Sequence, residues 1–119
     1  NRNNLKEIIK IIHPEVRKKM NIFIKKNKKK KVIILDIPLL LENKINKKKD
    51  ILVFVESKKM QILKRLKKRK NFDFKIINKF RKIQLSLDYK KKKSKFIIKN
   101  NFTNGFVKKQ IKYILKQIH

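Results

Sequence analysis

Two acids and a proline interrupt the apolar stretch VIILDIPLLLEN, which occupies residues 32–43 of a chain otherwise dominated by lysine. Asp36 stands at the end of a β-branched run, and Glu42 follows the turn expected at Pro38. Open parallel sheets bind ligands beyond the carboxyl ends of their strands, where a carboxylate can reach a metal-bound water or a substrate hydroxyl. The pattern therefore predicts a ligand-binding rim. The same spacing also fits an Asp that caps a turn and a Glu that pairs with a lysine.

A second candidate is the segment QILKRLKKR, in which Gln61, Arg65 and Arg69 recur every four residues and so share one helix face. Only five of the 38 basic residues are arginine, and two of them lie here. The planar guanidinium binds phosphate in a bidentate manner and stacks on flat rings, which lysine cannot do. This face is therefore a candidate contact for a phosphate or a base, and a solvated basic surface is the alternative.

Three apolar runs could form the strands that position these residues. Residues 32–37 and 51–55 are continuous β-branched runs of the kind buried in a parallel sheet, and residues 96–98 form a shorter third run. Helical patterns separate the runs, as the crossovers between parallel strands require. The sequence therefore predicts an α/β protein with a mainly parallel sheet.

Apolar residues at helical spacing predict five helices. Pro14 should open the second of them after a break, since proline is tolerated in a first turn. Ser57, Asp73 and Thr103 are candidate N-caps of the other three, and the basic segment 89–95 should be peripheral. The expected apolar stripes consist of Leu5, Ile8, Ile9 and Ile12; Val16, Met20, Phe23 and Ile24; Met60, Ile62, Leu63 and Leu66; Ile76, Ile77, Phe80 and Ile83; and Phe106, Val107, Ile111, Ile114, Leu115 and Ile118.

The net charge of +30 would ordinarily indicate a nucleic-acid partner. Lys, Ile and Asn, however, make up 65 of the 119 residues and Ala is absent, a composition that a genome poor in G and C imposes on any protein. A nucleic-acid surface would gather its cations on one face with aromatic residues between them, whereas Phe residues here fall mostly on apolar stripes. These observations disfavour a small basic nucleic-acid-binding protein, which remains the alternative function.

Length and cysteine content limit the class further. A chain of 119 residues makes one domain or part of one. Cysteine is absent, which excludes disulfides and thiolate metal sites and fits a reducing compartment. No apolar run approaches the roughly 20 residues that cross a bilayer. We expect a soluble, cytoplasmic protein without a membrane partner.

Four segments resemble, in order and spacing, the motifs of the dephospho-CoA kinase family: LKEIIKIIHPEVRKKM, VIILDIPLLLEN, ILVFVESKKMQILKRLKKR and IQLSLDYKKKKSKFIIKNN. The resemblance covers nearly all of the chain. It implies a P-loop NTPase-like three-layer α/β/α fold with a parallel sheet, in which residues 1–119 form the C-terminal part of one nucleotide-kinase domain. A lid-like insertion is expected at about residues 71–95. The implied reaction moves the γ-phosphoryl group of ATP, with Mg²⁺, onto the ribose 3′-hydroxyl of dephospho-CoA.

The same resemblance implies roles for individual residues. Asp36, Leu40 and Glu42 would line the acceptor side, with His13 and Arg17 on helices nearby. On the ATP side, the implied residues are Arg65 against the adenine, Arg69 near the phosphates and Asn100 near the adenine. The Pro-Leu-Leu-x-Glu turn favours dephospho-CoA over the acceptors of other nucleoside-phosphate kinases.

The chain departs from the family pattern in the lid. The lid usually carries an arginine four residues before Gln84, where this chain has Phe80, and the neighbouring Arg81 is the expected substitute. Ser86 replaces the lid proline, and Lys99 replaces the acid that usually precedes Asn100. Gln84 and Arg81 are therefore the lid candidates.

A phosphate-binding loop of the form G-x-x-x-x-G-K-[ST] cannot lie within these residues, because Gly105 is the only glycine. The family places that loop, and an acid expected to act as the base, before the first residue of this sequence. We therefore expect an inactive, marginally folded fragment without catalytic or metal-binding residues of its own. Without the intervening P-loop strand, the strands at residues 32–37 and 51–55 should stand about 10 Å apart with unpaired edges.

Overall fold

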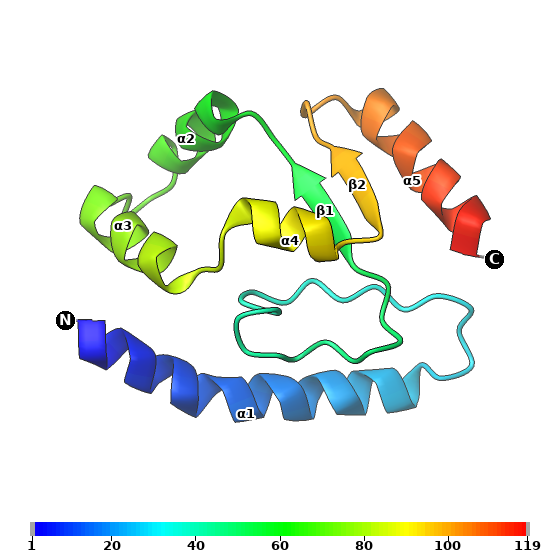
Figure 1. Cartoon of the computed structure of the whole chain (residues 1–119), viewed down its shortest axis with the longest axis horizontal. Helices are drawn as coiled ribbons and strands as arrows, with labels where there is room; N and C mark the ends of the chain where they lie inside the picture. Colours follow the sequence, from blue (N-terminus) through cyan, green and yellow to red (C-terminus); the bar gives the residue numbers. More distant parts are fainter. Residues whose placement is uncertain (1, 119) are drawn as a thin grey trace. The chain divides into compact units, whose positions relative to one another are not determined.

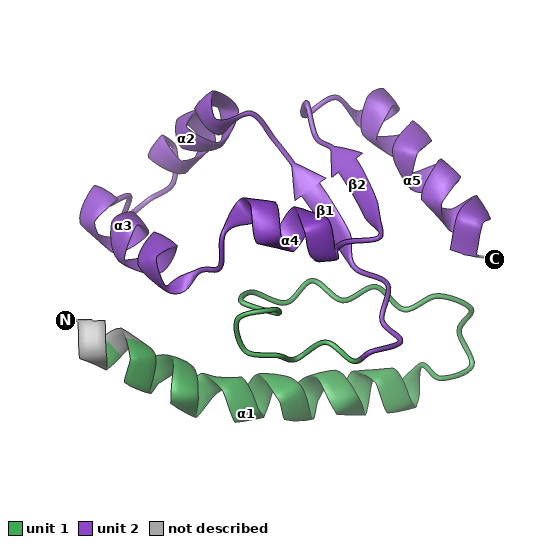
Figure 2. Ribbon diagram, viewed as in Figure 1, with its two compact units in different colours: residues 1–47 green, residues 48–119 purple. Residues whose placement is uncertain are grey.

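Five helices and two strands follow one another in the part of the chain that the structure describes: α1 (Arg2–Lys26), β1 (Val53–Glu56), α2 (Lys59–Lys67), α3 (Phe74–Ile83), α4 (Leu87–Lys93), β2 (Phe96–Lys99) and α5 (Asn104–Ile118) (Figure 1). This computed structural model describes residues 2–118, with the backbone alone for Arg2, Asn3 and Leu5. The chain divides into two units, residues 1–47 and residues 48–119 (Figure 2).

A single helix, α1, runs through the point where two helices were expected. Pro14 lies inside it and removes one N–H donor from the helical ladder. The buried and half-buried residues Ile9, Val16, Met20 and Ile24 nevertheless form one continuous stripe across the proline. The predicted break at Pro14 is therefore wrong, because packing along one stripe offsets the lost hydrogen bond.

Residues 32–37, which were predicted as a strand, form no β-strand in the described chain. A strand is defined by hydrogen bonds to a neighbour, and in the described residues β1 pairs only with β2. A β-branched composition alone was therefore not sufficient to form a strand at residues 32–37. The expected spacing of about 10 Å between this segment and the 51–55 run stays a prediction.

The predicted strands at residues 51–55 and 96–98 are present, with small shifts, as β1 and β2. They pair in parallel, with Val53 beside Phe96 and Glu56 beside Lys99. The chain crosses from one to the other through α2, α3 and α4, because parallel neighbours cannot be joined by a tight turn (Figure 1). The α/β class with parallel pairing is thus confirmed.

The two edges of this small sheet differ. The carbonyl oxygens of Leu52 and Glu56 accept hydrogen bonds from Lys95 and Asn100, so the even-numbered residues of β1 face β2. Strand residues alternate, and the backbone groups of Val53 and Val55 therefore point to the opposite edge. That edge of β1 carries no further strand in the described chain.

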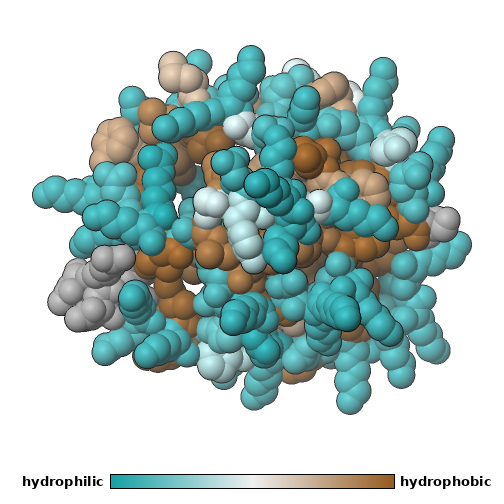
Figure 3. Space-filling model, in the orientation of Figure 1, coloured by the Kyte–Doolittle hydropathy of each residue, from teal (hydrophilic) through white to brown (hydrophobic). Residues whose placement is uncertain are grey.

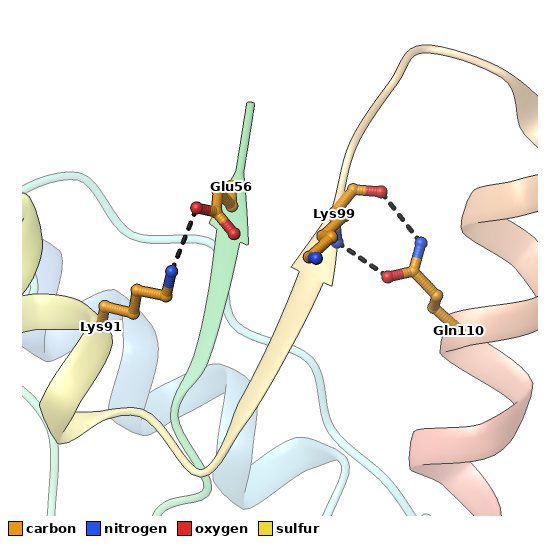
Figure 4. A network of polar contacts seen from close by, with 4 residues as sticks. All are labelled: Glu56, Lys91, Lys99 and Gln110. Atoms are coloured by element: carbon orange, nitrogen blue, oxygen red, sulfur yellow. Dashed lines mark hydrogen bonds and ion pairs between the residues drawn. The ribbon is translucent and has the colours of Figure 1, made fainter. Parts of the chain in front are cut away.

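The outer edge of β2 is covered instead by a side chain. The Gln110 amide on α5 accepts a hydrogen bond from the Lys99 N–H at 2.8 Å and donates one to the Lys99 carbonyl at 2.9 Å (Figure 4). A side-chain amide thus takes the place of a neighbouring strand at this position. The sheet is therefore closed at Lys99 on the β2 side and open on the β1 side.

Local capping signals explain where α3 and α4 begin. The Asp73 carboxylate accepts a hydrogen bond from the Lys75 N–H at 2.9 Å, which confirms the predicted cap. The Ser86 hydroxyl similarly accepts from Tyr89 N–H at 3.2 Å and starts α4, so part of the basic segment expected to be peripheral is helical. The Ser57 prediction is wrong, because Lys58 occupies the N-cap of α2 without a side-chain hydrogen bond.

Few side chains are buried in the described chain. The buried apolar residues are Met20, Ile45 and Ile114. Hydrophilic side chains cover much of the visible face, with apolar ones exposed between them (Figure 3). Several members of the expected stripes are at least two-fifths exposed, namely Ile8, Ile12, Phe23, Met60, Ile76 and Phe106. The side chain of Leu5 lies outside the described residues.

The length and the polarity of the helices decide whether any of them could span a membrane. None of the described helices is both long enough and apolar enough to cross a bilayer.

Candidate functional site

In the first unit, α1 holds the turn formed by residues 38–44. His13 Nε2 lies 3.1 Å from the Asn43 carbonyl oxygen. Arg17, one helical turn later, donates through Nη2 to the carbonyl oxygens of Asn43 at 3.4 Å and Lys44 at 3.3 Å. Two of the acceptor-side candidates, His13 and Arg17, therefore act together on the backbone of this turn.

The contact with Asn43 indicates which ring nitrogen of His13 carries a hydrogen. A carbonyl oxygen only accepts, so the ring nitrogen 3.1 Å from Asn43 must carry a proton and donate it. The same nitrogen then cannot accept from Arg17 Nη2, which lies 3.4 Å away. Arg17 donates instead to the carbonyl oxygens of the turn.

The turn itself has an unusual backbone. Leu39 and Lys44 have positive φ angles of 55° and 50°, a region that costs an L-residue about 1 kcal/mol each. The turn is closed by hydrogen bonds from Asn43 N–H to the Leu39 carbonyl and from Ile45 N–H to the Leu40 carbonyl, both 3.0 Å long. The contacts from α1 and the burial of Ile45 support this strained shape.

The other acceptor-side candidates lie on or before the same turn. Leu40 and Glu42 are half-buried, whereas Asp36 is exposed. The structure thus brings His13 and Arg17 to the turn that contains Leu40 and Glu42, and it places Asp36 two residues before that turn.

In the second unit, two ATP-side candidates, Arg65 and Asn100, both contact Phe102 in the loop that follows β2. The Arg65 guanidinium carbon lies 3.7 Å from the centre of the Phe102 ring. Phe102 belongs to the loop after β2, where its N–H donates to Asn100 Oδ1 at 2.8 Å. Asn100 N–H in turn donates to the Glu56 carbonyl at 2.7 Å. Arg65 and Asn100 are therefore linked through Phe102.

Arg69 and the two lid candidates line one groove of about 890 Å³ between α2, α3 and the start of α4. Its walls carry Arg69, Arg81 and Gln84 beside apolar side chains such as Ile62, Leu66 and Phe80. Polar and cationic groups over an apolar wall suit a ligand with a flat apolar part and an anionic part. The groove thus gathers residues that are 15 positions apart in the sequence.

An ion pair ties α4 to the first strand. Lys91 Nζ lies 3.1 Å from Glu56 Oε1, and both side chains are roughly two-fifths exposed (Figure 4). This pair, the Gln110 amide and Phe102 were all missed by the sequence reasoning. Only Phe102 had a local sequence signal. It follows Asn100 and Asn101 at the end of a predicted strand, and asparagine side chains often form tight turns by bonding to the backbone two residues later.

Metal ligands are not gathered in this part of the chain. Among residues 2–118, no group of three or more His, Asp and Glu side chains lies close enough together to hold an ion.

Comparisons with known proteins show the family of this chain. A family model described as Dephospho-CoA kinase matches residues 1–105. Relatives named Dephospho-CoA kinase include one from Wolbachia pipientis wMel, 35% identical over 98% of this chain, and one from Bacillus anthracis, 35% identical over 93%. One from Rickettsia typhi is 33% identical over 90% of the chain.

Coverage of the relatives themselves is partial. The matched region makes up 60% of the Wolbachia protein and 56% of the Bacillus and Rickettsia proteins. The chain therefore spans somewhat less than two-thirds of the length of these relatives. The family match extends over most of the chain and names the family whose motifs the sequence resembles. The chain belongs to the dephospho-CoA kinase family.

Proposed function

We propose that this chain forms part of an enzyme that transfers the γ-phosphoryl group of ATP to the 3′-hydroxyl of dephospho-CoA, giving coenzyme A. The observation that carries the proposal is the meeting of Arg65 with the Asn100 loop at the carboxyl end of a parallel strand pair. Nucleotides bind at such ends in open α/β sheets. Family membership supports the choice of reaction.

On the ATP side, each residue has a distinct physical role in this proposal. Arg65 lies flat against the adenine, because a guanidinium stacks on planar rings. Arg69, four residues further on, reaches the phosphates by charge-assisted hydrogen bonds. Asn100 orders the loop that borders the adenine, since its side chain accepts from the Phe102 N–H. Arg81 and Gln84 approach the phosphates from the lid-like segment 71–95 through the groove they share with Arg69.

On the acceptor side, the turn at residues 38–44 forms the rim. His13 and Arg17 fix its backbone through the Asn43 and Lys44 carbonyls. Leu40 provides an apolar contact, and Asp36 and Glu42 provide carboxylates for the sugar hydroxyls of dephospho-CoA. Fixing the turn before binding lowers the entropy lost when the acceptor is positioned.

We also propose that the phosphate-binding loop and the catalytic base come from a segment that precedes this sequence in the whole protein. The open edge of β1 supports this, because its Val53 and Val55 backbone groups can pair with one more parallel strand. Their side chains are 40% and 57% exposed, an arrangement that a neighbouring strand and its helix would cover. Mg²⁺ belongs to the same proposal, with its ligands outside the residues described.

The test uses the product of the complete gene. It should release ADP from ATP when dephospho-CoA is supplied, and not when it is replaced by adenosine, AMP or pantetheine. The 119-residue chain alone should neither turn over nor bind ATP tightly. Turnover by the 119 residues alone, or equal turnover with AMP as the acceptor, would contradict the proposal.

The net charge of +30 requires one precaution in that test. Any polyanion is attracted to such a chain, so ATP and dephospho-CoA binding should be measured at about 150 mM salt, where the screening length is about 8 Å. The alternative function predicts that duplex DNA or RNA binds more tightly than ATP under these conditions. We expect the reverse, with nucleic-acid binding that declines steeply between about 50 and 200 mM salt.

A further inference from the structure

Phe102 has a backbone conformation that phenylalanine normally avoids. Its φ angle is 61°, in the left-handed region where glycine and asparagine are the usual residues. A bulky L-residue placed there loses about 1 kcal/mol relative to the right-handed region. Contacts of the Phe102 backbone, of its ring, or of both must therefore offset this loss.

The loop around Phe102 is built to hold that conformation. Asn100 Oδ1 accepts the Phe102 N–H at 2.8 Å, and Asn101 Oδ1 accepts the Thr103 N–H at 3.0 Å. Asn100 is itself tied to β1, because its N–H donates to the Glu56 carbonyl at 2.7 Å. Two hydrogen bonds, through Asn100, thus connect the backbone of Phe102 to β1.

One contact of the ring is with Arg65. The guanidinium carbon is 3.7 Å from the ring centre, a distance that suits a guanidinium lying flat on the ring. Phe102 is half-buried, whereas Arg65 stays exposed. The ring therefore covers one face of the guanidinium and leaves the other face to solvent.

We propose that Phe102 is a positioning residue: its ring holds the Arg65 guanidinium flat so that the opposite face receives the adenine of ATP. This rests on the proposed ATP-dependent function. The stack would then run from phenyl ring to guanidinium to purine, and a long flexible side chain would lose little entropy on binding because one face is already fixed. An arginine without this support would have to be ordered by the nucleotide itself.

The test compares variants of the complete gene product at position 102. Phe102→Leu keeps an apolar side chain and the strained backbone but removes the π face. Phe102→Gly removes the ring and also relieves the backbone. Phe102→Tyr keeps the ring. Phe106→Leu, on α5, is the control for loss of a phenyl ring outside the proposed stack.

We expect KM for ATP to rise about tenfold in Phe102→Leu and Phe102→Gly, with kcat changed less than about twofold. A tenfold rise in KM corresponds to about 1.4 kcal/mol of lost binding free energy. Phe102→Tyr and Phe106→Leu should keep the original KM. Phe102→Gly should unfold at the same temperature or higher, which separates positioning from folding. Upfield ring-current shifts of the Arg65 side-chain signals, seen by NMR without nucleotide, should disappear in Phe102→Leu.

Other outcomes separate the two proposals. If Arg65→Ala raises KM for ATP while Phe102→Leu and Phe102→Gly leave it unchanged, the positioning role is overturned and the ATP site stands. Absence of the ring-current shift in the unsubstituted protein overturns it as well. If the unsubstituted protein does not use ATP, or if Arg65→Ala leaves KM unchanged, the proposed function of this site fails instead.

Discussion

The Nε2 atom of His13 lies 3.1 Å from the carbonyl oxygen of Asn43, 30 residues further along the chain. The bond fixes one end of the strained turn that carries Leu40 and Glu42. His13→Ala should therefore raise KM for dephospho-CoA about fivefold in the complete gene product, as expected for a hydrogen bond worth about 1 kcal/mol, and leave KM for ATP unchanged. Steady-state kinetics with each substrate varied in turn checks this.

His13→Gln is the matched control for that change. Its side-chain N–H can take the place of the ring N–H and donate to the Asn43 carbonyl. The KM for dephospho-CoA should return to within about twofold of the original value. Equal effects of alanine and glutamine would show that the ring matters for some reason other than this hydrogen bond.

A lid substitution tests the groove between α2 and α3. Arg81 lines this groove, whereas Lys82 is the next cation on α3 and is not among its lining residues. Arg81→Ala should lower kcat/KM for ATP by about tenfold or more, because one charge-assisted contact to phosphate is lost. Lys82→Ala should change it less than about twofold. Similar losses for both would indicate a general charge effect.

The cap of α3 gives a stability prediction. Asp73→Ala leaves the Lys75 N–H without its acceptor and should lower the free energy of unfolding by about 1 kcal/mol. Asp73→Asn keeps an accepting oxygen and should be within a few tenths of a kcal/mol of the original. Denaturant unfolding followed by circular dichroism measures both, and an equal loss in both variants would assign the effect to charge rather than to capping.

Gln110→Ala tests the covered edge of the sheet. It leaves the Lys99 N–H and carbonyl without their partners and should cost about 1–2 kcal/mol. Gln110→Glu should not rescue it, because a carboxylate cannot donate to the Lys99 carbonyl. Gln117→Ala, an exposed position on the same helix, is the control and should be nearly neutral.

The pair of Glu56 and Lys91 should matter less. Both side chains are partly exposed, and such pairs are worth about 0.2–1 kcal/mol. A double-mutant cycle with Glu56→Gln and Lys91→Met should give a coupling energy in that range that falls as salt is added. A larger coupling that does not respond to salt would contradict the exposed geometry.

Features set by local chemistry could be predicted from the sequence. The cap at Asp73 and the strands β1 and β2 depend on neighbouring residues or on short apolar runs, and these were found with shifts of one or two residues. Residues 32–37 have the same kind of run, yet form no strand in the described chain. A strand needs a partner, and composition cannot supply one.

The arrangement around Arg65 could be predicted only in part. Its spacing from Arg69 predicted one helix face for Gln61, Arg65 and Arg69, which is wrong for Arg69 because α2 ends at Lys67. The ring beneath Arg65 comes from Phe102, 37 positions later. That contact depends on how two strands bring their following loops together. Gln110 was not predictable for a similar reason, because the phase of α5 relative to β2 decides which side chain meets Lys99.

The unequal edges of the β1–β2 pair limit how copies of this chain can associate. Edge-to-edge pairing through β1 about a twofold axis would leave β2 on both outer sides, where Gln110 occupies the Lys99 backbone groups. In copies whose β1 edge is not covered by a preceding strand, growth beyond such a pair would have to displace the Gln110 amide from the Lys99 backbone groups.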